Sequence, residues 1–300
     1  MSLVLLMQAA ASGIVTGCVY ALVALSLVIV YKSTDVVNFA GGELVMLGAY
    51  IGLLGLVYFE VSYAAMFALA VVTVFATGAL FEYVVLNTIR GRRYRAHVDL
   101  VPLVVATVGL SYLLKGVVRV VPYTEEVRRL PPLLSGPSVV LGDVILQRQD
   151  LVIIAITVVI MTALTVFFKI TTTGKAWRAT SQNSRAAALI GIPVKKMRMA
   201  AWGLASAIAG IAGILLAPKL LMTPEMGVVV MLAFAAAIIG GFTSLPGCVI
   251  GGVILGVVQN FVGILLSPQA IAVTPFFVII VVLLLRPHGL LGEAVAPKKV

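Results

Sequence analysis

Apolar residues occur along the chain in long runs that short polar stretches separate. A helix of about 20 apolar residues crosses the hydrocarbon core of a bilayer, and lipid offers its backbone no partner outside the helix itself. The expected fold is therefore an all-α, polytopic membrane helix bundle of about eight or nine transmembrane helices, organised as one domain over residues 1–300. The predicted spans are residues 3–30, 43–59, 63–86, 101–121, 151–168, 200–221, 228–242, 248–266 and 272–285.

Two longer polar stretches interrupt the apolar pattern. Residues 122–150 combine Pro131, Pro132 and Pro137 with mixed charge. This composition is typical of a loop, and it leaves a small hairpin and an interfacial helix as alternatives within it. The second stretch, residues 170–199, is basic and rich in alanine, and we refer to it as the basic segment.

The basic segment carries signals for a helix, a turn and a return to the membrane. Threonines at 171–173 offer hydroxyl groups that cap a helix start, and residues 175–190 are rich in helix formers. Gly191 stands where a helix C-terminal cap is expected, and Pro193 is suited to start the next helix. Such a helix, with Trp177 as its one aromatic residue, is either inserted into a partner's cleft or an ordinary basic loop.

The composition agrees with a membrane protein and excludes a soluble one. Hydrophobic residues make up 62% of the chain and charged residues 11%, and the mean hydropathy is +1.17. Soluble domains contain about 45–50% apolar and 25% charged residues. Nine spans leave no room for a large soluble domain, so an energy-converting domain is expected on another polypeptide. The net charge of +10 follows from the positive-inside rule and contact with membrane lipid, and we expect no nucleic-acid partner.

The basic residues also predict the orientation of the chain. If Lys32, residues 90–95, residues 169–198 and the C-terminal tail are cytoplasmic, that side holds fifteen of the 21 Lys and Arg residues. The N-terminus is then outside, the C-terminus is cytoplasmic and residues 122–150 form an external loop. The first apolar run is too long for a signal-peptide core and has no basic start, so we expect it to be a true span.

Small residues recur at four-residue spacing within the apolar stretches. Such pairs lie on one helix face and let two backbones approach closely, because packing drives helix association in lipid. We expect tight helix packing at these positions, and a substrate passage lined by backbone is the alternative. The pairs are Gly48 and Gly52, Gly203 and Ala207, Ala209 and Gly213, Gly247 and Gly251, and Gly252 and Gly256.

The start of the second predicted span is a candidate part of a translocation pathway. Glu43 stands there, after Asn38, Gly41 and Gly42. Charged residues at membrane depth are costly and therefore call for a function or a partner. An irregular helix start with these residues either aims backbone dipoles at a ligand or anchors neighbouring helices.

Other polar residues within the spans have simpler expected roles. Gln259 and Asn260 either hydrogen-bond across helices or line a polar path. Glu82 is expected to pair with loop arginines, and Lys115 and Arg119 are expected to extend their charges outward to the membrane surface. Because no catalytic triad, carboxylate pair or metal-ligand cluster emerges at plausible depth, we expect neither an enzyme active site nor a metal.

Several motifs occur in the same order as in a known transporter family. Residues 174–179, followed by Asn183, residues 186–188 and Gly191-Ile192, resemble the coupling segment of branched-chain amino-acid ABC transporter permeases of the LivH type. Together the motifs cover nearly the whole chain, which resembles an inner-membrane permease of this family. Further matching motifs stand at residues 20–22, 37–43, 46–50, 240–247, 251–252 and 286–292.

The resemblance implies one permease half of an importer. Its partners are a second, homologous or identical permease, two cytoplasmic ATPase subunits that grip the basic segment, and an external solute-binding protein. The coupling residues that it implies are Gly174, Lys175, Trp177, Arg178, Asn183, Ala187 and Gly191.

The chain itself lacks the phosphate-binding loop G-x-x-x-x-G-K-[ST]. Lys169 stands where the first glycine is needed, and Ala176 follows Gly174-Lys175. We therefore expect no cofactor on this chain and ATP bound by the partner subunits. The expected function is import of branched-chain amino acids or a related small polar solute across a bacterial-type inner membrane.

Two alternatives stay open. One is a urea or short-amide permease of the same family. The other is a stand-alone secondary transporter or channel, which the scarcity of paired titratable residues near mid-membrane disfavours.

Overall fold

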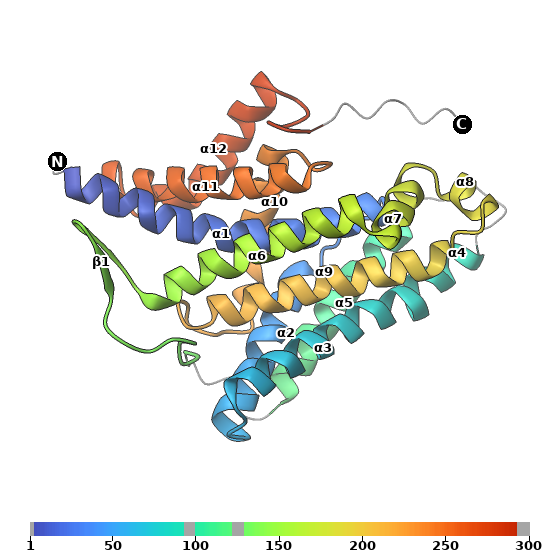
Figure 1. Cartoon of the computed structure of the whole chain (residues 1–300), viewed down its shortest axis with the longest axis horizontal. Coiled ribbons are helices and arrows are strands. Elements are labelled where there is room, and N and C mark those ends of the chain that lie inside the picture. Colours follow the sequence, from blue (N-terminus) through green and yellow to red (C-terminus); the bar gives the residue numbers. More distant parts are fainter. Residues whose placement is uncertain (1–2, 93–99, 122–128, 293–300) are drawn as a thin grey trace. The chain divides into compact units, whose positions relative to one another are not determined.

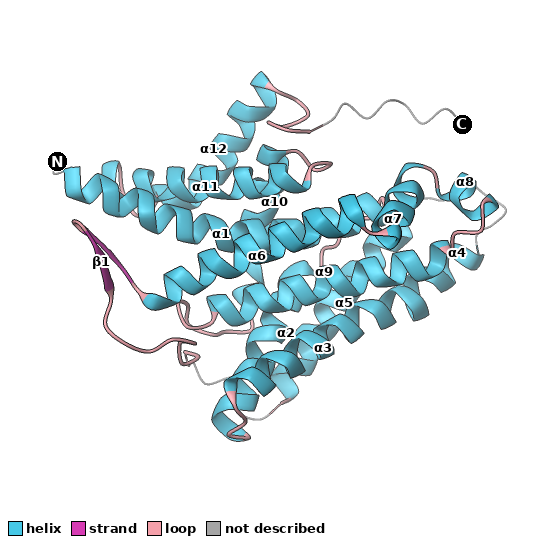
Figure 2. Ribbon diagram, in the orientation of Figure 1, coloured by secondary structure: helices cyan, strands magenta, loops and turns pink. Residues whose placement is uncertain are grey.

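In the computed structural model, which describes residues 3–92, 100–121 and 129–292, helices make up most of the described chain (Figure 2). The α-helices are α1 (Leu3–Thr34), α2 (Gly41–Leu53), α3 (Tyr63–Phe81), α4 (Asn87–Arg92), α5 (Val101–Val120), α6 (Arg148–Ile170), α7 (Thr172–Gln182), α8 (Ser184–Leu189), α9 (Val194–Leu216), α10 (Val229–Gly240), α11 (Leu245–Leu265) and α12 (Ala270–Leu285). Two π-helical turns, η1 (Leu54–Tyr58) and η2 (Glu82–Leu86), extend α2 and join α3 to α4, and a 3-10 turn, η3 (Met226–Val228), precedes α10.

All nine predicted spans are helical, which confirms a polytopic helical membrane bundle. Seven helical stretches have the length and hydropathy to cross a membrane within the described ranges. The stretches Met226–Gly240 and Ala270–Leu285 are apolar but shorter.

The predicted external loop contains the hairpin that the sequence left open. Strands β1 (Val139–Leu141) and β2 (Val144–Leu146) pair antiparallel, with Val139 opposite Leu146. The loop ends earlier than predicted, because α6 already begins at Arg148. Residues 122–128 of the predicted loop lie outside the described residues.

The helices gather into two compact units. One contains Met1–Val28, Leu134–Thr157 and Val230–Val300, and the other contains Ile29–Leu133 and Val158–Val229. We call them the outer-segment unit and the central-segment unit after their positions in the sequence. Each unit draws on separate stretches of sequence, so one permease domain over residues 1–300 stays a prediction.

The central-segment unit is built on α9, which packs against α2 and α3 (Figure 1). Backbones meet directly at Gly48 and Gly210, where an added Cβ on Gly48 would lie 2.5 Å from the Gly210 Cα. Gly213 likewise leaves no room for a side chain beside Val45. These contacts confirm tight packing at small residues. The buried cluster around them contains Met46, Ala49, Tyr50, Leu53, Met66, Ala70, Val118, Leu130, Ile214, Ala217, Met222 and Met226.

In the outer-segment unit, α1 and α11 likewise pack closely through glycines. Gly252 and Gly256 face Gly13 and Gly17, with too little space for a Cβ at either end of the contact. The spacing of Gly252 and Gly256 predicts close packing at this helix face, but it does not indicate which helix packs there.

The outer-segment unit also accommodates a proline, Pro275, inside α12. Pro275 has no N–H, so the carbonyl of Ile271, four residues earlier, loses its helical donor. The Gln259 side chain of α11 donates to this carbonyl at 3.2 Å. Gln259 therefore joins two helices, whereas Asn260 donates to Gly256 O within its own helix.

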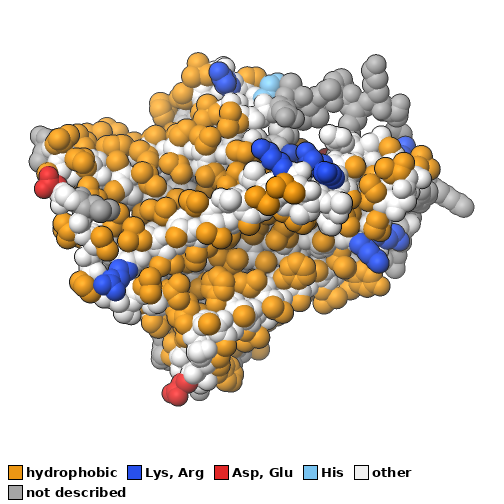
Figure 3. All heavy atoms as spheres, in the orientation of Figure 1, with side chains coloured by type: hydrophobic (Ala, Val, Ile, Leu, Met, Phe, Trp, Pro, Cys, Tyr) orange, Lys and Arg blue, Asp and Glu red, His pale blue; other side chains and the backbone are white. Residues whose placement is uncertain are grey.

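Hydrophobic side chains dominate the face shown in Figure 3, and Lys and Arg appear in small separate groups. Many exposed large side chains lie on the predicted spans, including Tyr112 and Phe276. Such exposure is expected where lipid rather than water surrounds a helix.

Candidate functional site

The basic segment folds as two helices rather than the single helix predicted over residues 175–190. The break is at Asn183, whose Oδ1 accepts the N–H groups of Arg185 and Ala186 at 3.0 Å and so caps α8. Asn is among the strongest N-cap residues, which favours a new helix start at this position. Propensity alone suggested a continuous helix because the alanines that follow are good helix formers.

The ends of the segment agree with the prediction. Thr171 Oγ1 accepts the N–H of Gly174 at 2.9 Å and caps α7. Gly191 has φ +86, and its N–H donates to Ala188 O, so it ends α8 in the left-handed conformation that glycine adopts without strain. Pro193 occupies the N-cap position of α9.

One face of α7 is buried against the central-segment unit. The Trp177 indole donates to Ser33 Oγ at 2.5 Å and packs edge-on against Phe167 and Phe168. Gly174 lies so close to the Phe167 carbonyl that no side chain fits. Trp177 is only 4% exposed, so if the helix enters a partner's cleft, it presents another face to the partner than the one that carries Trp177.

The opposite face of the segment is open. Of the residues implied for coupling, Gly174, Trp177 and Ala187 are buried, and Lys175, Arg178, Asn183 and Gly191 are exposed. Leu189 and Ile190 are 89% and 76% exposed, although both are large and apolar. Sequence reasoning missed this pair, whose only signal is two aliphatic residues at the end of a polar helix.

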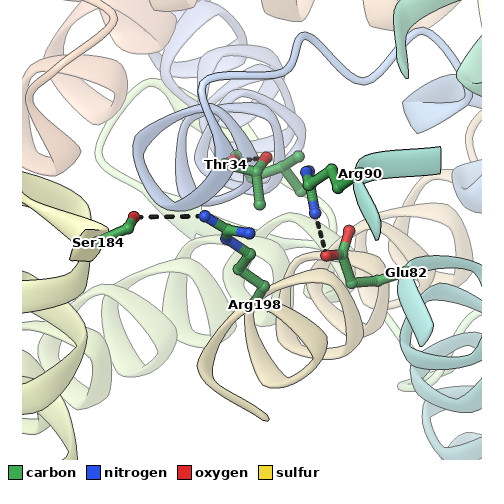
Figure 4. A network of polar contacts seen from close by, with 6 residues as sticks. Thr34, Glu82, Arg90, Ser184 and Arg198 are labelled. Atoms are coloured by element: carbon green, nitrogen blue, oxygen red, sulfur yellow. Dashed lines mark hydrogen bonds and ion pairs between the residues drawn. The ribbon is translucent and has the colours of Figure 1, made fainter. Parts of the chain in front are cut away.

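A polar network connects α8 to the bundle (Figure 4). Arg198 of α9 points toward Ser184, the first residue of α8, and its Nη2 donates to Ser184 Oγ at 3.4 Å. On its other side lies Glu82, which accepts a hydrogen bond from Arg90. Arg198 also interacts electrostatically with Asp35, next to the end of α1. The pairing of Glu82 with an arginine confirms the sequence prediction.

This network is incompletely satisfied. Glu82 is 2% exposed. Glu82 Oε2, Arg90 Nη2 and Arg198 Nε make no hydrogen bond within the described part of the chain. Glu82 also begins the π-helical turn η2, and such turns occur frequently at functional sites. The network therefore combines two arginines and one carboxylate where α3, α4, α8 and α9 approach one another.

The predicted pathway residues before α2 surround a buried carboxylate. Asn38 Oδ1 accepts the N–H of Ala40 at 3.0 Å and shapes the turn. Gly42 touches Gly227 backbone to backbone. Glu43 forms an ion pair with Lys115 Nζ at 3.3 Å. Glu43 thus pairs with α5 rather than with the first span.

Lys115 of α5 does not extend outward as predicted, whereas the Arg119 side chain stays more than half exposed. Lys115 turns toward Glu43, and Arg119 pairs with Glu225 at 2.6 Å. A nearby carboxylate provides a better partner than the distant membrane surface, and sequence alone does not reveal which segment supplies it. Gln259 and Asn260 belong to the outer-segment unit.

The motifs at residues 240–247 and 286–292 meet at the end of α10. Leu290 and Leu291 donate their N–H groups to Ile239 O and Gly240 O at 2.9 and 3.0 Å. Gly241 and Gly289 both have positive φ and lie too close together to carry side chains. These two motifs therefore have a packing role within the outer-segment unit.

Comparison with known proteins identifies the family of the chain. Residues 9–285 match the family described as "Branched-chain amino acid transport system / permease component". The chain belongs to this family. Its members are transport subunits rather than enzymes, and the chain is a multi-pass membrane protein.

Similar individual proteins cover almost the whole chain. The high-affinity branched-chain amino acid transport system permease protein BraD of Pseudomonas aeruginosa is 30% identical, over 96% of both chains. The permease protein LivH of Escherichia coli K12 is 31% identical over 94% of both chains. The probable LivH of Methanocaldococcus jannaschii is 29% identical, over 90% of this chain and 88% of its own.

A solved structure is similar in fold. It is described as "PsaBC from Streptococcus pneumoniae in complex with Fab", and the matching chain is 14% identical with a TM-score of 0.50. The match covers 98% of this chain and 92% of that chain. At this identity the similarity shows the fold alone.

Proposed function

We propose that this chain is the membrane-spanning permease half of an ABC importer for branched-chain amino acids in a bacterial-type inner membrane. The family match over residues 9–285 carries this proposal. A second permease, two cytoplasmic ATPase subunits and an external solute-binding protein complete the transporter. ATP binds to the partner subunits, and this chain needs no cofactor of its own.

Helices α7 and α8 of the basic segment form the ATPase-docking surface in this proposal. Lys175, Arg178 and Arg185 supply positive charge on its open face, and Leu189 with Ile190 forms an exposed aliphatic tip. A small exposed apolar pair surrounded by polar residues is typical of a protein interaction site. Arg178 and the tip face the ATPases, while Trp177 faces the bundle.

The buried contacts of the segment transmit the movement of the ATPases. Trp177 joins α7 to Ser33 near the end of α1 and to the end of α6. Ser184 joins α8 to Arg198 at the start of α9. When ATP closes the partner subunits, these contacts pass the displacement to three helices, in the manner of a rigid-body switch. The N-terminus lies outside and the C-terminus lies in the cytoplasm.

The double substitution Leu189→Glu with Ile190→Glu tests the docking surface. Both side chains are exposed, so we expect normal abundance in the membrane. Buried carboxylates at the interface cost several kcal/mol, and we therefore expect ATP-dependent leucine uptake and co-purification of the ATPase to fall by about tenfold or more.

The conservative pair Leu189→Met with Ile190→Leu is the matched control and should retain uptake. Uptake of leucine and of urea is measured in vesicles that contain the permeases, the ATPases and the loaded binding protein. Wild-type uptake by the glutamate pair contradicts the docking role. Transport of urea but not leucine contradicts the proposed substrate.

A further inference from the structure

Glu43 and Lys115 form an ion pair that is buried on one side only. Glu43 is the third residue of α2 and is 5% exposed, whereas the Lys115 side chain is 32% exposed. Glu43 Oε1 lies 3.3 Å from Lys115 Nζ. Glu43 Oε2 makes no hydrogen bond within the described part of the chain. A buried carboxylate oxygen therefore has unused hydrogen-bonding capacity beside a partly accessible ammonium group.

The backbone before α2 is irregular inside the bundle. The N–H of Phe39 donates to Thr107 Oγ1 at 3.2 Å, and Thr107 is completely buried. Because Thr107 lies within the predicted span α5, the irregular backbone at Phe39 lies beside a membrane span. Non-helical backbone is tolerated there only where protein buries it or where it lines a polar cavity.

The start of α2 is held close to a second segment. A Cβ on Gly42 would collide with the Gly227 carbonyl, and a Cβ on Gly227 would lie 3.2 Å from Glu43 Oε1. The positive end of a helix dipole and the Glu43 carboxylate are thus fixed beside Lys115. The Glu43 carboxylate is a hydrogen-bond acceptor, and the Lys115 ammonium group and the start of α2 are two positive groups beside it.

A second pair of opposite charges lies one helical turn further along α5. Arg119 Nη2 contacts Glu225 Oε1 at 2.6 Å, and both side chains are more than half exposed. Exposure thus decreases from the Arg119–Glu225 pair to the Lys115–Glu43 pair. The Arg119–Glu225 pair is therefore an exposed surface pair, whereas the Lys115–Glu43 pair is largely buried.

From this geometry, and on the basis of the proposed function, we propose that Glu43 and Lys115 bind the charged headgroup of an α-amino acid during transport. Glu43 Oε2 accepts the substrate ammonium group, and Lys115 with the start of α2 binds the substrate carboxylate. Without substrate, the charges of Glu43 and Lys115 neutralise each other. A bound amino acid is a zwitterion with no net charge, so each charge still has a partner of opposite sign at membrane depth.

The double substitution Glu43→Gln with Lys115→Gln tests this site without leaving either charge alone. Removing both partners of a buried ion pair is often nearly neutral for stability, so we expect normal assembly. Each charge-assisted bond to the substrate is lost, and we expect the maximal rate of leucine uptake to fall by about tenfold or more. ATP hydrolysis stimulated by leucine-loaded binding protein, and its half-saturating concentration, should change less than about twofold.

The measurement uses the complete transporter in vesicles, with uptake and ATP hydrolysis recorded together. The matched control is Arg119→Gln with Glu225→Gln, which removes the exposed pair and should lower uptake by less than about threefold. ATP-dependent leucine uptake by the unaltered complex tests the proposed function separately.

Two results would overturn the headgroup site. One is wild-type leucine uptake by the Glu43→Gln, Lys115→Gln variant. The other is loss of assembled complex, which assigns the pair a structural role. The single Lys115→Gln variant provides a second check, because Lys115 lies at the more accessible side of the pair. It should also lower uptake per ATP hydrolysed, and unchanged coupling in this variant rejects the proposal.

Discussion

Trp177 shows how one residue can have a different role from the one that its position suggests. A tryptophan in a polar, basic helix points to a partner, yet its ring packs against Phe167 and Phe168 of the same chain. The indole N–H also has an internal acceptor in Ser33. Because Ser33 is 144 positions away in the sequence, no local pattern indicated this contact.

We expect Trp177→Ala to destabilise the complex strongly, since truncation of a buried aromatic side chain costs about 3–5 kcal/mol. Trp177→Phe keeps most of the packing and loses one hydrogen bond, worth about 1 kcal/mol. The thermal unfolding midpoint of the solubilised transporter should therefore decrease in the order wild type, Phe variant, Ala variant. An Ala variant as stable as the wild type would falsify this anchoring role.

At the scale of helices, the Arg198 network links the docking segment to the membrane bundle. Arg198 lies between Ser184 of α8 and the Glu82–Arg90 pair (Figure 4). Its loss leaves the Glu82–Arg90 ion pair in place. The link between α8 and α9 is then broken selectively.

We expect Arg198→Gln to reduce leucine uptake by about fivefold while ATP hydrolysis changes less, because a charge-assisted hydrogen bond contributes roughly 1.5–3 kcal/mol before solvent screening. Lys195→Gln, in the exposed first turn of the same helix, is the control and should leave both rates unchanged. Parallel recording of uptake and ATP hydrolysis separates the two effects. Equal losses in both rates would argue against a role in coupling.

The sequence predicted the long helices well, because the period and length of apolar runs depend little on tertiary context. It also predicted the glycine stop at Gly191, where local backbone conformation decides the outcome. It did not predict the π-helical turns or the break at Asn183. It also did not reveal the Lys115–Glu43 pair, which depends on segments 72 positions apart in the numbering of the chain.

At the scale of the whole molecule, the orientation in the membrane connects the docking and headgroup proposals. The distribution of Lys and Arg predicts that the basic segment is cytoplasmic. In this orientation, we expect the turn at Glu60, between η1 and α3, to lie outside. Both Glu60 and Leu189 are exposed and are suitable for labelling.

We expect a membrane-impermeant maleimide to label Glu60→Cys but not Leu189→Cys in intact cells. Disruption of the membrane should make Leu189→Cys reactive. The native Cys18 and Cys248 are buried and form no disulfide, so a variant with both replaced by alanine gives the background. Labelling of Leu189→Cys from outside would reverse the orientation and reject the proposed function.

Pro275 interrupts the hydrogen-bond pattern of α12 without leaving the Ile271 carbonyl unpaired. A proline inside a membrane helix leaves the carbonyl four residues earlier without its helical N–H donor. An unpaired carbonyl is costly in hydrocarbon. Here the Gln259 side chain of the neighbouring helix α11 donates the hydrogen bond that the proline cannot. A change of helix angle at Pro275 therefore need not expose the Ile271 carbonyl, provided that α11 and α12 stay in contact.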